Sequence, residues 1–308
     1  YTASAYGIYV SGIVGGDITN SGNILVEALS GSSSSAYVQG IYVGELDGSI
    51  TNSGLIDVYA HSVTTTAYAY GIYVGNSMDG TITNSGSGVI TVAATAGEAG
   101  AEAYGVYIDG DVNIGGGIVN DGRIEAVAET LNDSSSASAW GIYVDDGLYG
   151  TIENSGDILA SAMATDYDAY AYGIEIDDGD VDGSITNTGT ITARDAIRIT
   201  DDAPTTLSSN EIFNSGTLIG RLNAISVSGG QIRVNNTGLA ATTTPSTAAP
   251  EAAITLNGTN VQVDNSGTVQ AAAGGISATG SIVARIGNSG TVMAETGLKA
   301  VSTSGVIL

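Results

Sequence analysis

One short phrase recurs along the whole sequence and constrains the fold more than any other feature. It reads Gly-Ser-Ile-Thr-Asn-Ser-Gly at residues 48–54, and close copies occupy residues 80–86 and 183–189. In each copy a short apolar strand leads into Asn, a small polar residue and Gly. Gly accepts a left-handed backbone without penalty, and Asn tolerates it while bonding its own neighbouring backbone. We therefore expect a strand followed by a sharp corner at every copy.

The spacing of these corners indicates a repeat architecture. Successive corner asparagines are 22 to 36 residues apart, and a drifting period of this size is typical of a solenoid, in which each repeat contacts only its neighbours. The shortest interval holds three strands of about five residues and three turns, which is one rung of a parallel β-helix. The corner asparagines are Asn20, Asn52, Asn84, Asn120, Asn154, Asn187, Asn214, Asn236, Asn265 and Asn288.

A second phrase, Gly-Ile-Tyr-Val, gives the orientation of another strand. In copies such as residues 71–74 and 141–144, branched aliphatic residues alternate with one variable residue, as in a half-buried strand. The aliphatic residues should face the interior and the middle residue the outside. Crossover connections between parallel strands strongly favour the right-handed sense. The sequence thus predicts an all-β fold, a right-handed parallel β-helix of about ten to twelve coils with three strands per coil.

The repeat is unbroken, so residues 1–308 are expected to form one β-helix domain. Residues 1–193 have long returns rich in Ala, Ser and Tyr after the third strand, which we expect to be lengthened strands. In residues 194–308 these returns nearly vanish, apart from one Pro-containing loop at 240–250. The N-terminal coils should therefore be wide and the C-terminal coils narrower. The corner asparagines should stack into a ladder of side-chain amides that holds the register of the rod.

Charge and composition disfavour several classes of partner. The chain has 7 Lys and Arg against 32 Asp and Glu, a formal net charge of −25. A basic nucleic-acid footprint is absent, binding to an anionic membrane surface is disfavoured, and this charge favours solubility and divalent cations. No run of about 20 apolar residues could span a membrane as a helix. The absence of Cys removes disulfide and thiolate chemistry.

Two columns of aromatic residues are expected on the outer surface. Stacked, exposed rings could bind sugar rings or form a lateral protein contact. The alternative is that they only stabilise the sheet, because aromatic pairs on a sheet face do so by themselves. One column is Tyr9, Tyr42, Tyr73, Tyr107 and Tyr143, ending at Glu175 and Arg198; the other is Tyr6, Tyr70, Tyr104, Trp140 and Tyr172, interrupted by Gln39.

Acidic residues gather in the loops that follow the Gly-Ile-Tyr-Val strands. The densest group is Asp177, Asp178, Asp180 and Asp182. Ca²⁺ takes oxygen ligands from flexible, Asp-rich loops, so these four residues are candidate calcium ligands. Their spacing matches neither the EF-hand pattern nor the Gly-Gly-x-Gly-x-Asp repeat of calcium-binding β-rolls, and a solvated acidic edge is the simpler interpretation. No other cofactor is predicted.

Few residues suggest catalysis. The single histidine, His61, has no Ser, Asp or Cys constellation beside it. Arg194 and Arg198 flank Asp195, and polysaccharide lyases on this fold use Arg or Lys as a base near acidic residues. A shared fold does not by itself indicate a shared function. A salt bridge between neighbouring coils is the simpler role for these arginines. We therefore predict that the chain is not an enzyme.

The repeats of Ile-Thr-Asn-Ser-Gly-x-Ile, alternating with Gly-Ile-x-Val, resemble the passenger regions of bacterial autotransporters and related secreted β-helix repeat proteins. The resemblance covers nearly the whole chain. It implies a parallel β-helix that is exported to the bacterial cell surface. It also implies a role as an adhesin, a biofilm component or a plain stalk.

The sequence therefore predicts an extracellular structural or adhesive β-solenoid that associates with itself, end to end or laterally, into a surface filament. Residues 1–10 already fit the repeat and residues 297–308 end apolar, so either the sequence was cut from a longer solenoid or the ends pair with other copies. Two alternatives stay open. One is a carbohydrate-active enzyme resembling polysaccharide lyases, and the other is an adhesin that binds a glycan or a receptor on a host cell through its long returns.

Overall fold

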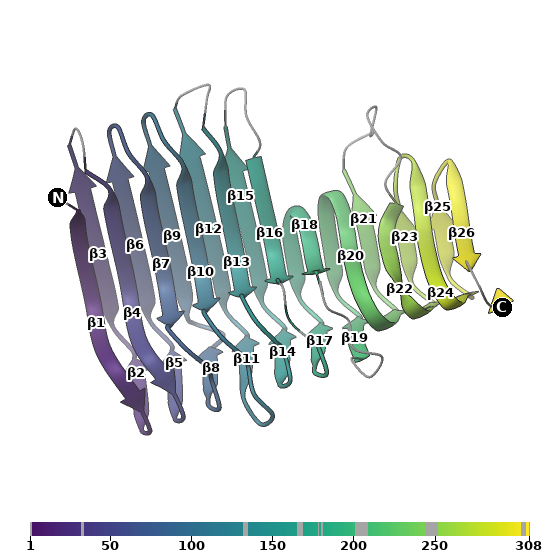
Figure 1. Ribbon diagram of the computed structural model, residues 1–308, viewed down its shortest axis with the longest axis horizontal. Helices are drawn as coiled ribbons and strands as arrows, with labels where there is room; N and C mark the ends of the chain where they lie inside the picture. The colour runs from purple at the N-terminus through teal and green to yellow at the C-terminus, as the bar shows by residue number, and fades with distance from the viewer. Residues whose placement is uncertain are drawn as a thin grey trace.

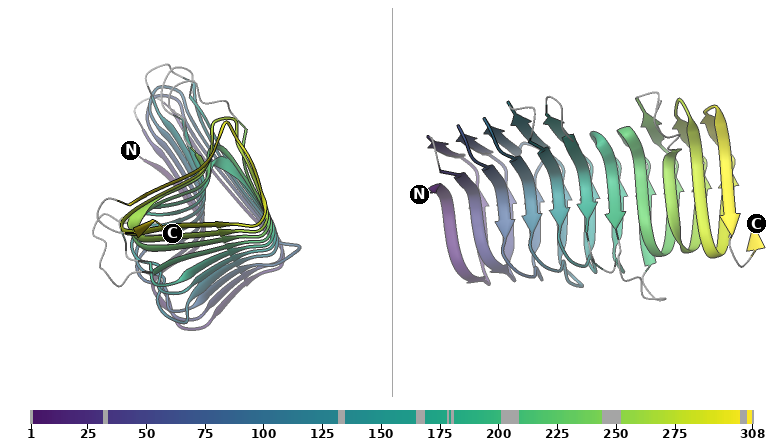
Figure 2. Two further views of the ribbon diagram at one scale, coloured as in Figure 1. Left: turned by 90° about the vertical axis from the view of Figure 1, so that its right-hand side faces the viewer. Right: turned by 45° about the horizontal axis from the view of Figure 1, so that its top comes forward.

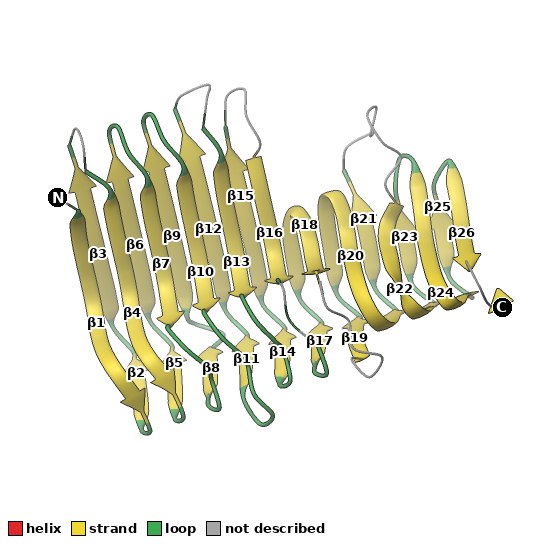
Figure 3. Cartoon of the chain, viewed as in Figure 1, coloured by secondary structure: helices red, strands yellow, loops and turns green. Residues whose placement is uncertain are grey.

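The protein is a parallel β-solenoid, as the sequence predicts. The computed structural model describes residues 2–31, 34–131, 135–164, 169–177, 179, 181–200, 209–243, 252–302 and 306–307. This part of the chain contains strands and no helix (Figure 3). Each strand pairs in parallel with a strand one coil farther along, so that 27 strands form one continuous sheet wound around a horizontal axis (Figure 1).

Each coil has three sides, and in the first five coils each side is a separate strand. The first side carries the Gly-Ile-Tyr-Val phrase, the second side carries the Ile-Thr-Asn phrase, and the third side follows the asparagine corner. The first side consists of β1 (Ala3–Val14), β4 (Ala36–Leu46), β7 (Ala67–Val74), β10 (Ala101–Ile108), β13 (Ala137–Val144) and, in the sixth coil, β16 (Ala169–Ile176).

The second and third sides stack in the same order. The second side consists of β2 (Asp17–Asn20), β5 (Ser49–Asn52), β8 (Thr81–Asn84), β11 (Gly117–Asn120), β14 (Thr151–Asn154), β17 (Ser184–Asn187) and β19 (Ser209–Asn214). The third side consists of β3 (Asn23–Ser30), β6 (Leu55–Ser62), β9 (Val89–Ala96), β12 (Arg123–Thr130) and β15 (Asp157–Met163).

Farther along, the strands run around the corners. β18 begins on the third side against β15 and continues on the first side against β16, and β20 covers all three sides by itself. Coils built of three separate strands are therefore fewer than the ten to twelve predicted. These last strands are β18 (Thr190–Thr200), β20 (Thr217–Asn236), β21 (Leu239–Thr242), β22 (Ala252–Asn265), β23 (Thr268–Gln270), β24 (Gly274–Asn288), β25 (Thr291–Met293), β26 (Thr296–Ser302) and β27 (Val306–Ile307).

The coils narrow along the chain, as the sequence predicts. The long returns end with β15, and β18 turns its corner directly, with a shift of register between Ala193 and Asp195. Viewed along the axis, the C-terminal coils form a smaller triangle than the N-terminal coils (Figure 2). The start of the predicted loop at 240–250 belongs to β21, and residues 244–250 lie outside the described residues.

Aliphatic side chains fill the interior in ladders. On the second side, isoleucines at one position stack on successive coils. Three members of this ladder, Ile50, Ile82 and Ile118, are fully buried. Another buried ladder runs from Leu46 through Met78 and closes the corner beneath the acidic loops. Each such residue contributes about 1.5–3 kcal/mol of burial free energy, so the core alone favours one register between coils.

The predicted asparagine ladder is present at the corner after the second side. The Nδ2 of every corner asparagine except the last donates a hydrogen bond to Oδ1 of the asparagine one coil farther on, at 2.7–2.8 Å, and these nine bonds join all ten corner asparagines. Several of these amides also donate to a backbone carbonyl of the next coil. A shift of one coil against the next would leave buried amides without partners, which fixes the register.

The corner glycines are needed for a reason other than the one predicted. Among the described glycines only Gly115 has a positive φ, of 95°, so the repeated corners do not use the left-handed backbone. Instead, successive coils approach too closely there for a side chain. A Cβ on Gly54 would lie 2.0 Å from the carbonyl oxygen of Gly22, and one on Gly156 would lie 2.0 Å from that of Gly122.

Candidate functional site

The first side of the wide coils bends inward, and we call the strip of packed, outward-facing rings along this bend the aromatic groove. In β7 the residues alternate inside and outside as far as Tyr70, but Gly71 and Ile72 then both face the core before Tyr73 faces out again. A Cβ on Gly71 would lie 2.5 Å from the carbonyl oxygen of Gly105, so this bend requires glycine. Two successive inward residues turn the outline of the coil inward (Figure 2) and bring the rings of Tyr70 and Tyr73 to 5.0 Å between centroids.

The register of the strands stacks both predicted aromatic columns along this groove. The first column passes from Tyr9 to Tyr143 and continues through Glu175 to Arg198, as the sequence predicts. Gln39 interrupts the second column, and its Nε2 donates to the hydroxyl of Tyr37 at 2.7 Å.

Sequence reasoning missed three aromatic residues that complete the groove. They stand two residues before the second column, and this spacing was the available signal because outward positions recur every two residues in a strand. The ring of Tyr37 bridges the gap at Gln39, with centroids 5.4 Å from Tyr70 and 6.5 Å from Tyr6. The three missed residues are Tyr37, Tyr68 and Tyr170.

Most rings of the aromatic columns are covered at least in part, which corrects the expected exposure: four of the ten are buried, four are half-buried and two are exposed. Tyr70, Tyr104 and Tyr143 are only 7–8% exposed, whereas Tyr9 in the first coil is 55% exposed. The rings cover each other, since Tyr104 and Trp140 stack at 4.3 Å with an angle of 1° between their planes. The groove is therefore a second core on the outside of the solenoid, and a sugar ring finds open aromatic rings only at its first coil.

Tyrosine hydroxyls tie the groove to the acidic loops. Tyr73 and Tyr107 both donate to the carboxylate of Asp109, at 3.0 and 3.1 Å, and Tyr143 donates to Asp145 at 2.7 Å. Burial is the main cause that raises the pKa of each of these tyrosines above its ordinary value, and the nearby carboxylates raise it further. The hydroxyls therefore stay protonated at neutral pH and remain donors.

Of the four candidate calcium ligands, the structure describes Asp177 and Asp182. Asp177 accepts a hydrogen bond of 3.4 Å from Tyr143, and Asp182 is exposed at the start of the second side. Asp178 and Asp180 lie outside the described residues. Within the part of the chain that the structure describes, no group of three or more His, Cys, Asp or Glu residues could hold a metal ion. Calcium binding stays a prediction.

An ion pair closes the groove where the coils narrow. Glu175 is 2% exposed, accepts the indole N–H of Trp140, and lies 2.5 Å from Nη1 of Arg198 on the next coil. Burial raises the pKa of this carboxyl to about 7, although Arg198 and the indole N–H both lower it. The guanidinium of Arg198 also lies over the ring of Tyr172, 5.1 Å from its centroid.

The two arginines singled out by the sequence have different roles. Arg198 forms the predicted salt bridge between neighbouring coils, with Glu175. Among the described residues Arg194 forms no ion pair across coils: its partner there is the carboxylate of the adjacent Asp195, 4.0 Å away, and its guanidinium lies over the ring of Tyr170 at 4.7 Å. The carboxylate of Glu175 is covered, so this cluster stabilises the end of the groove.

His61 lies apart from the groove. It belongs to β6 on the third side of the coil, half-buried, and its ring stacks near that of Tyr59 with centroids 6.3 Å apart. The ion-pair cluster is on the first side. The structure therefore brings His61 together with neither of the arginines considered as a catalytic base.

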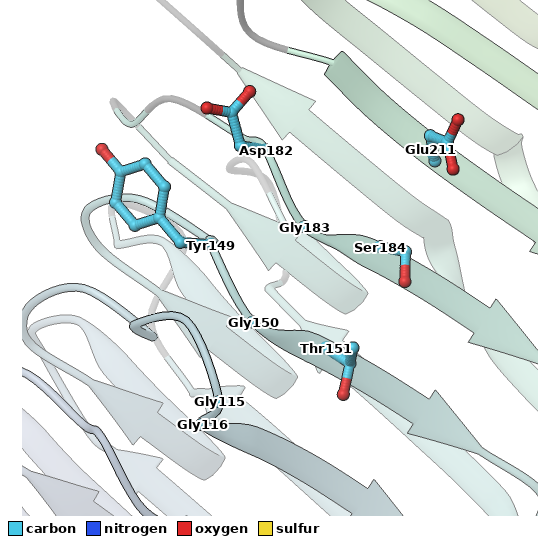
Figure 4. A pocket seen from close by; sticks show the side chains of 9 residues that line it. All are labelled: Gly115, Gly116, Tyr149, Gly150, Thr151, Asp182, Gly183, Ser184 and Glu211. Carbon is cyan, nitrogen blue, oxygen red and sulfur yellow. The ribbon is translucent and has the colours of Figure 1, made fainter.

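Two shallow hollows share Glu211 on the second side. The first, of about 410 Å³, has Tyr149 and Asp182 at one rim, Glu211 at the other, and Thr151 and Ser184 between them (Figure 4). The other lining residues are glycines, which have no side chains to fill the hollow: Gly115, Gly116, Gly150 and Gly183. The second hollow, of about 450 Å³, is lined by Glu211, Gln231, Ile232, Arg233, Asn260, Val261, Gln262, Val283 and Arg285.

Three comparisons with known proteins gave no match: none with models of protein families, none with curated proteins and none with solved structures. Within the described residues, no helix is long and apolar enough to cross a membrane. Any proposal for the function therefore rests on the fold, the asparagine ladder, the aromatic columns and the charge of the surface.

Proposed function

We propose that this chain is an extracellular structural β-solenoid, a stiff rod at the bacterial cell surface that associates with copies of itself into a filament. The observation that carries the proposal is the unbroken asparagine ladder, in which nine amide-to-amide bonds join ten successive coils. A side-chain ladder of this length stiffens a rod without forming a cavity for a substrate.

The direction of the bonds supports a mechanical role. In a parallel solenoid the bonds between coils run along the rod axis, and coils stack about 4.8 Å apart, so ten coils give a rod of roughly 50 Å. Between any two neighbouring coils, the backbone hydrogen bonds on three sides and the one side-chain amide bond at the corner then resist stretching together. Because each coil contacts only its neighbours, the same design extends to any number of coils.

The aromatic groove supports the same role in the wide coils. Rings from six coils pack into one another outside the main core, and the hydroxyls of Tyr107 and Tyr143 are held by Asp109 and Asp145. Aromatic pairs on adjacent strands stabilise a sheet beyond the area that they bury. A wide coil with long sides would otherwise be easier to deform, and the groove braces one of those sides.

The location is inferred from the repeat and from the charge. The repeats resemble those of exported β-helix passengers, and a formal charge of −25 without Cys suits a soluble surface rod outside the cell. Adhesion would use the long returns of residues 1–193 or the exposed rings of Tyr6 and Tyr9. Catalysis has no part in the proposal.

Negative-stain electron microscopy and sedimentation velocity of the purified chain, with calcium and with chelator, test the proposal. We expect straight particles longer than one chain in at least one buffer, and dependence on calcium would assign a role to the acidic loops. Short single rods in both buffers would contradict self-association. In that case a screen for binding to glycans and cell surfaces would test the adhesin alternative.

A further inference from the structure

The charge of the rod is divided unequally along its length. Residues 1–193 carry 25 of the 32 acidic residues and one of the seven basic residues. Residues 194–308 carry seven acidic and six basic residues, so their formal charge is near zero. Two rods lying side by side would therefore repel each other along their wide coils and not along their narrow coils. A lateral contact between copies is favoured only in the narrow part, with the acidic parts pointing away from each other.

The second side has a charge pattern that fits such a contact, along a row that runs from the last wide coil through the narrow coils. Strand register places Ser184, Glu211, Arg233, Gln262 and Arg285 at one outward position of five successive coils. The two hollows that share Glu211 lie along this row. One end of the row is acidic, since Asp182 and Glu211 line the first hollow, and the other end is basic.

The arginines of the basic end are available to a partner. Arg285 is exposed and forms no ion pair within the described residues. Arg233 lies 3.7 Å from Glu211, but both side chains are substantially exposed, at 51% and 36%, and an exposed pair of this kind contributes little. A carboxylate from another molecule could form bidentate bonds with either guanidinium.

We propose that this face is an isologous contact between two copies of the chain, with the two rods antiparallel. A two-fold axis across the row brings the acidic end of each copy opposite the basic end of the other, because a self-complementary patch is what two-fold pairing requires. The inference rests on the proposed self-association and names its lateral surface. An isologous contact closes at two copies, so it pairs rods and does not lengthen them.

A charge-exchange experiment tests the pairing. One variant carries Arg233→Glu and Arg285→Glu, and the other carries Asp182→Arg and Glu211→Arg. In each homodimer like charges would meet, so we expect the dimer dissociation constant of each variant alone to rise at least tenfold over wild type. In the mixture, every altered residue meets its complement, and we expect heterodimers of nearly wild-type affinity by sedimentation velocity at about 0.15 M salt.

The control variant is Arg123→Glu, which changes an exposed arginine of the wide coils and should leave the dimer unaffected. Circular dichroism of each variant checks that the solenoid is folded. Variants that dimerise as well as wild type, or a mixture that stays monomeric, would overturn the antiparallel contact. Long particles of both charge variants that still pair side by side would overturn it too while leaving the proposed filament in place, whereas wild-type rods that never associate would contradict both.

Discussion

Oε1 of Glu175 lies 2.5 Å from Nη1 of Arg198, and this pair joins two neighbouring coils at the place where the aromatic groove ends. Glu175 occupies the position that tyrosine holds in the five preceding coils. The next coil is narrow, and it places Asp195 rather than a ring next to Tyr172. The carboxylate therefore caps the groove, because it accepts the indole N–H of Trp140 on one side and the guanidinium on the other.

The stability of the rod should fall as pH rises through neutrality because of Glu175. The pKa of this carboxyl is about 7 in the folded protein, against about 4.5 when exposed, and burial is the main cause. A group whose pKa is raised by folding stabilises the fold below the unfolded pKa, and this contribution is lost as pH rises through the folded value. We expect the loss between about pH 4.5 and 7 to be on the order of 1–3 kcal/mol.

Urea unfolding of wild type and Glu175→Gln across this range measures the effect. The charged groups around the carboxyl are Arg198, which lowers its pKa, and Asp177, which raises it. Burial also raises the pKa of Glu102, so some pH dependence should remain in the variant. Equal pH dependence in wild type and variant would show that Glu175 titrates normally.

Removing one asparagine from the middle of the ladder should be costly. Asn120 accepts from Asn84 at 2.8 Å and donates to Asn154 at 2.7 Å, and all three are buried. Asn120→Ala leaves buried polar atoms without ladder partners, and we expect a loss of about 2–4 kcal/mol in the free energy of unfolding. Asn288→Ala, at an exposed position that ends the ladder, should cost under about 1 kcal/mol. Similar losses at both positions would argue against a cooperative ladder.

The buried rings should contribute far more stability than the exposed ones. Tyr104→Ala removes a ring that is 7% exposed and stacked between Tyr70 and Trp140, and we expect it to cost about 3–5 kcal/mol. Tyr9→Ala removes a ring that is 55% exposed and should cost about 1 kcal/mol or less. Trp140 is the single tryptophan, so its fluorescence reports directly on the groove. No red shift of its emission in the Tyr104 variant would contradict the stacked arrangement.

The glycine at the bend should not tolerate a side chain. A Cβ on Gly71 would lie 2.5 Å from a carbonyl oxygen of the next coil and 2.6 Å from Cγ2 of Ile90, so backbone would have to move. We expect Gly71→Ala to cost more than about 3 kcal/mol, as other substitutions that overpack a core do. Gly12→Ala, where a Cβ would meet nothing within 4 Å, is the matched control. Thermal melts of the two variants compare them, and equal midpoints would refute the close approach.

The parts of the fold that repeat could be predicted from the sequence. Stacking places equivalent residues of successive coils on one another, so the spacing of Asn52, Asn84 and Asn120 already implies a ladder, and alternation along Ile72, Tyr73 and Val74 implies which residues face the core. These features depend only on the spacing of the repeats and on the two-residue alternation within each strand.

The burial of the aromatic columns could not be predicted in the same way. It depends on the bend at Gly71, where two successive residues face inward, and on how closely the next coil approaches. Period alone indicates that Tyr70 faces outward but not that the outer surface is concave there. Likewise, Glu175 could be recognised as the end of a column, but its burial follows from the narrowing of the next coil.

Cryo-electron microscopy of the purified wild-type chain at neutral pH is the most direct test of a self-associating, ladder-stabilised rod. We predict straight particles longer than the roughly 50 Å expected of one chain, with an axial spacing of about 4.8 Å continuous along each particle. Particles no longer than a single chain, or particles in which that spacing does not run along the long axis, would contradict the account.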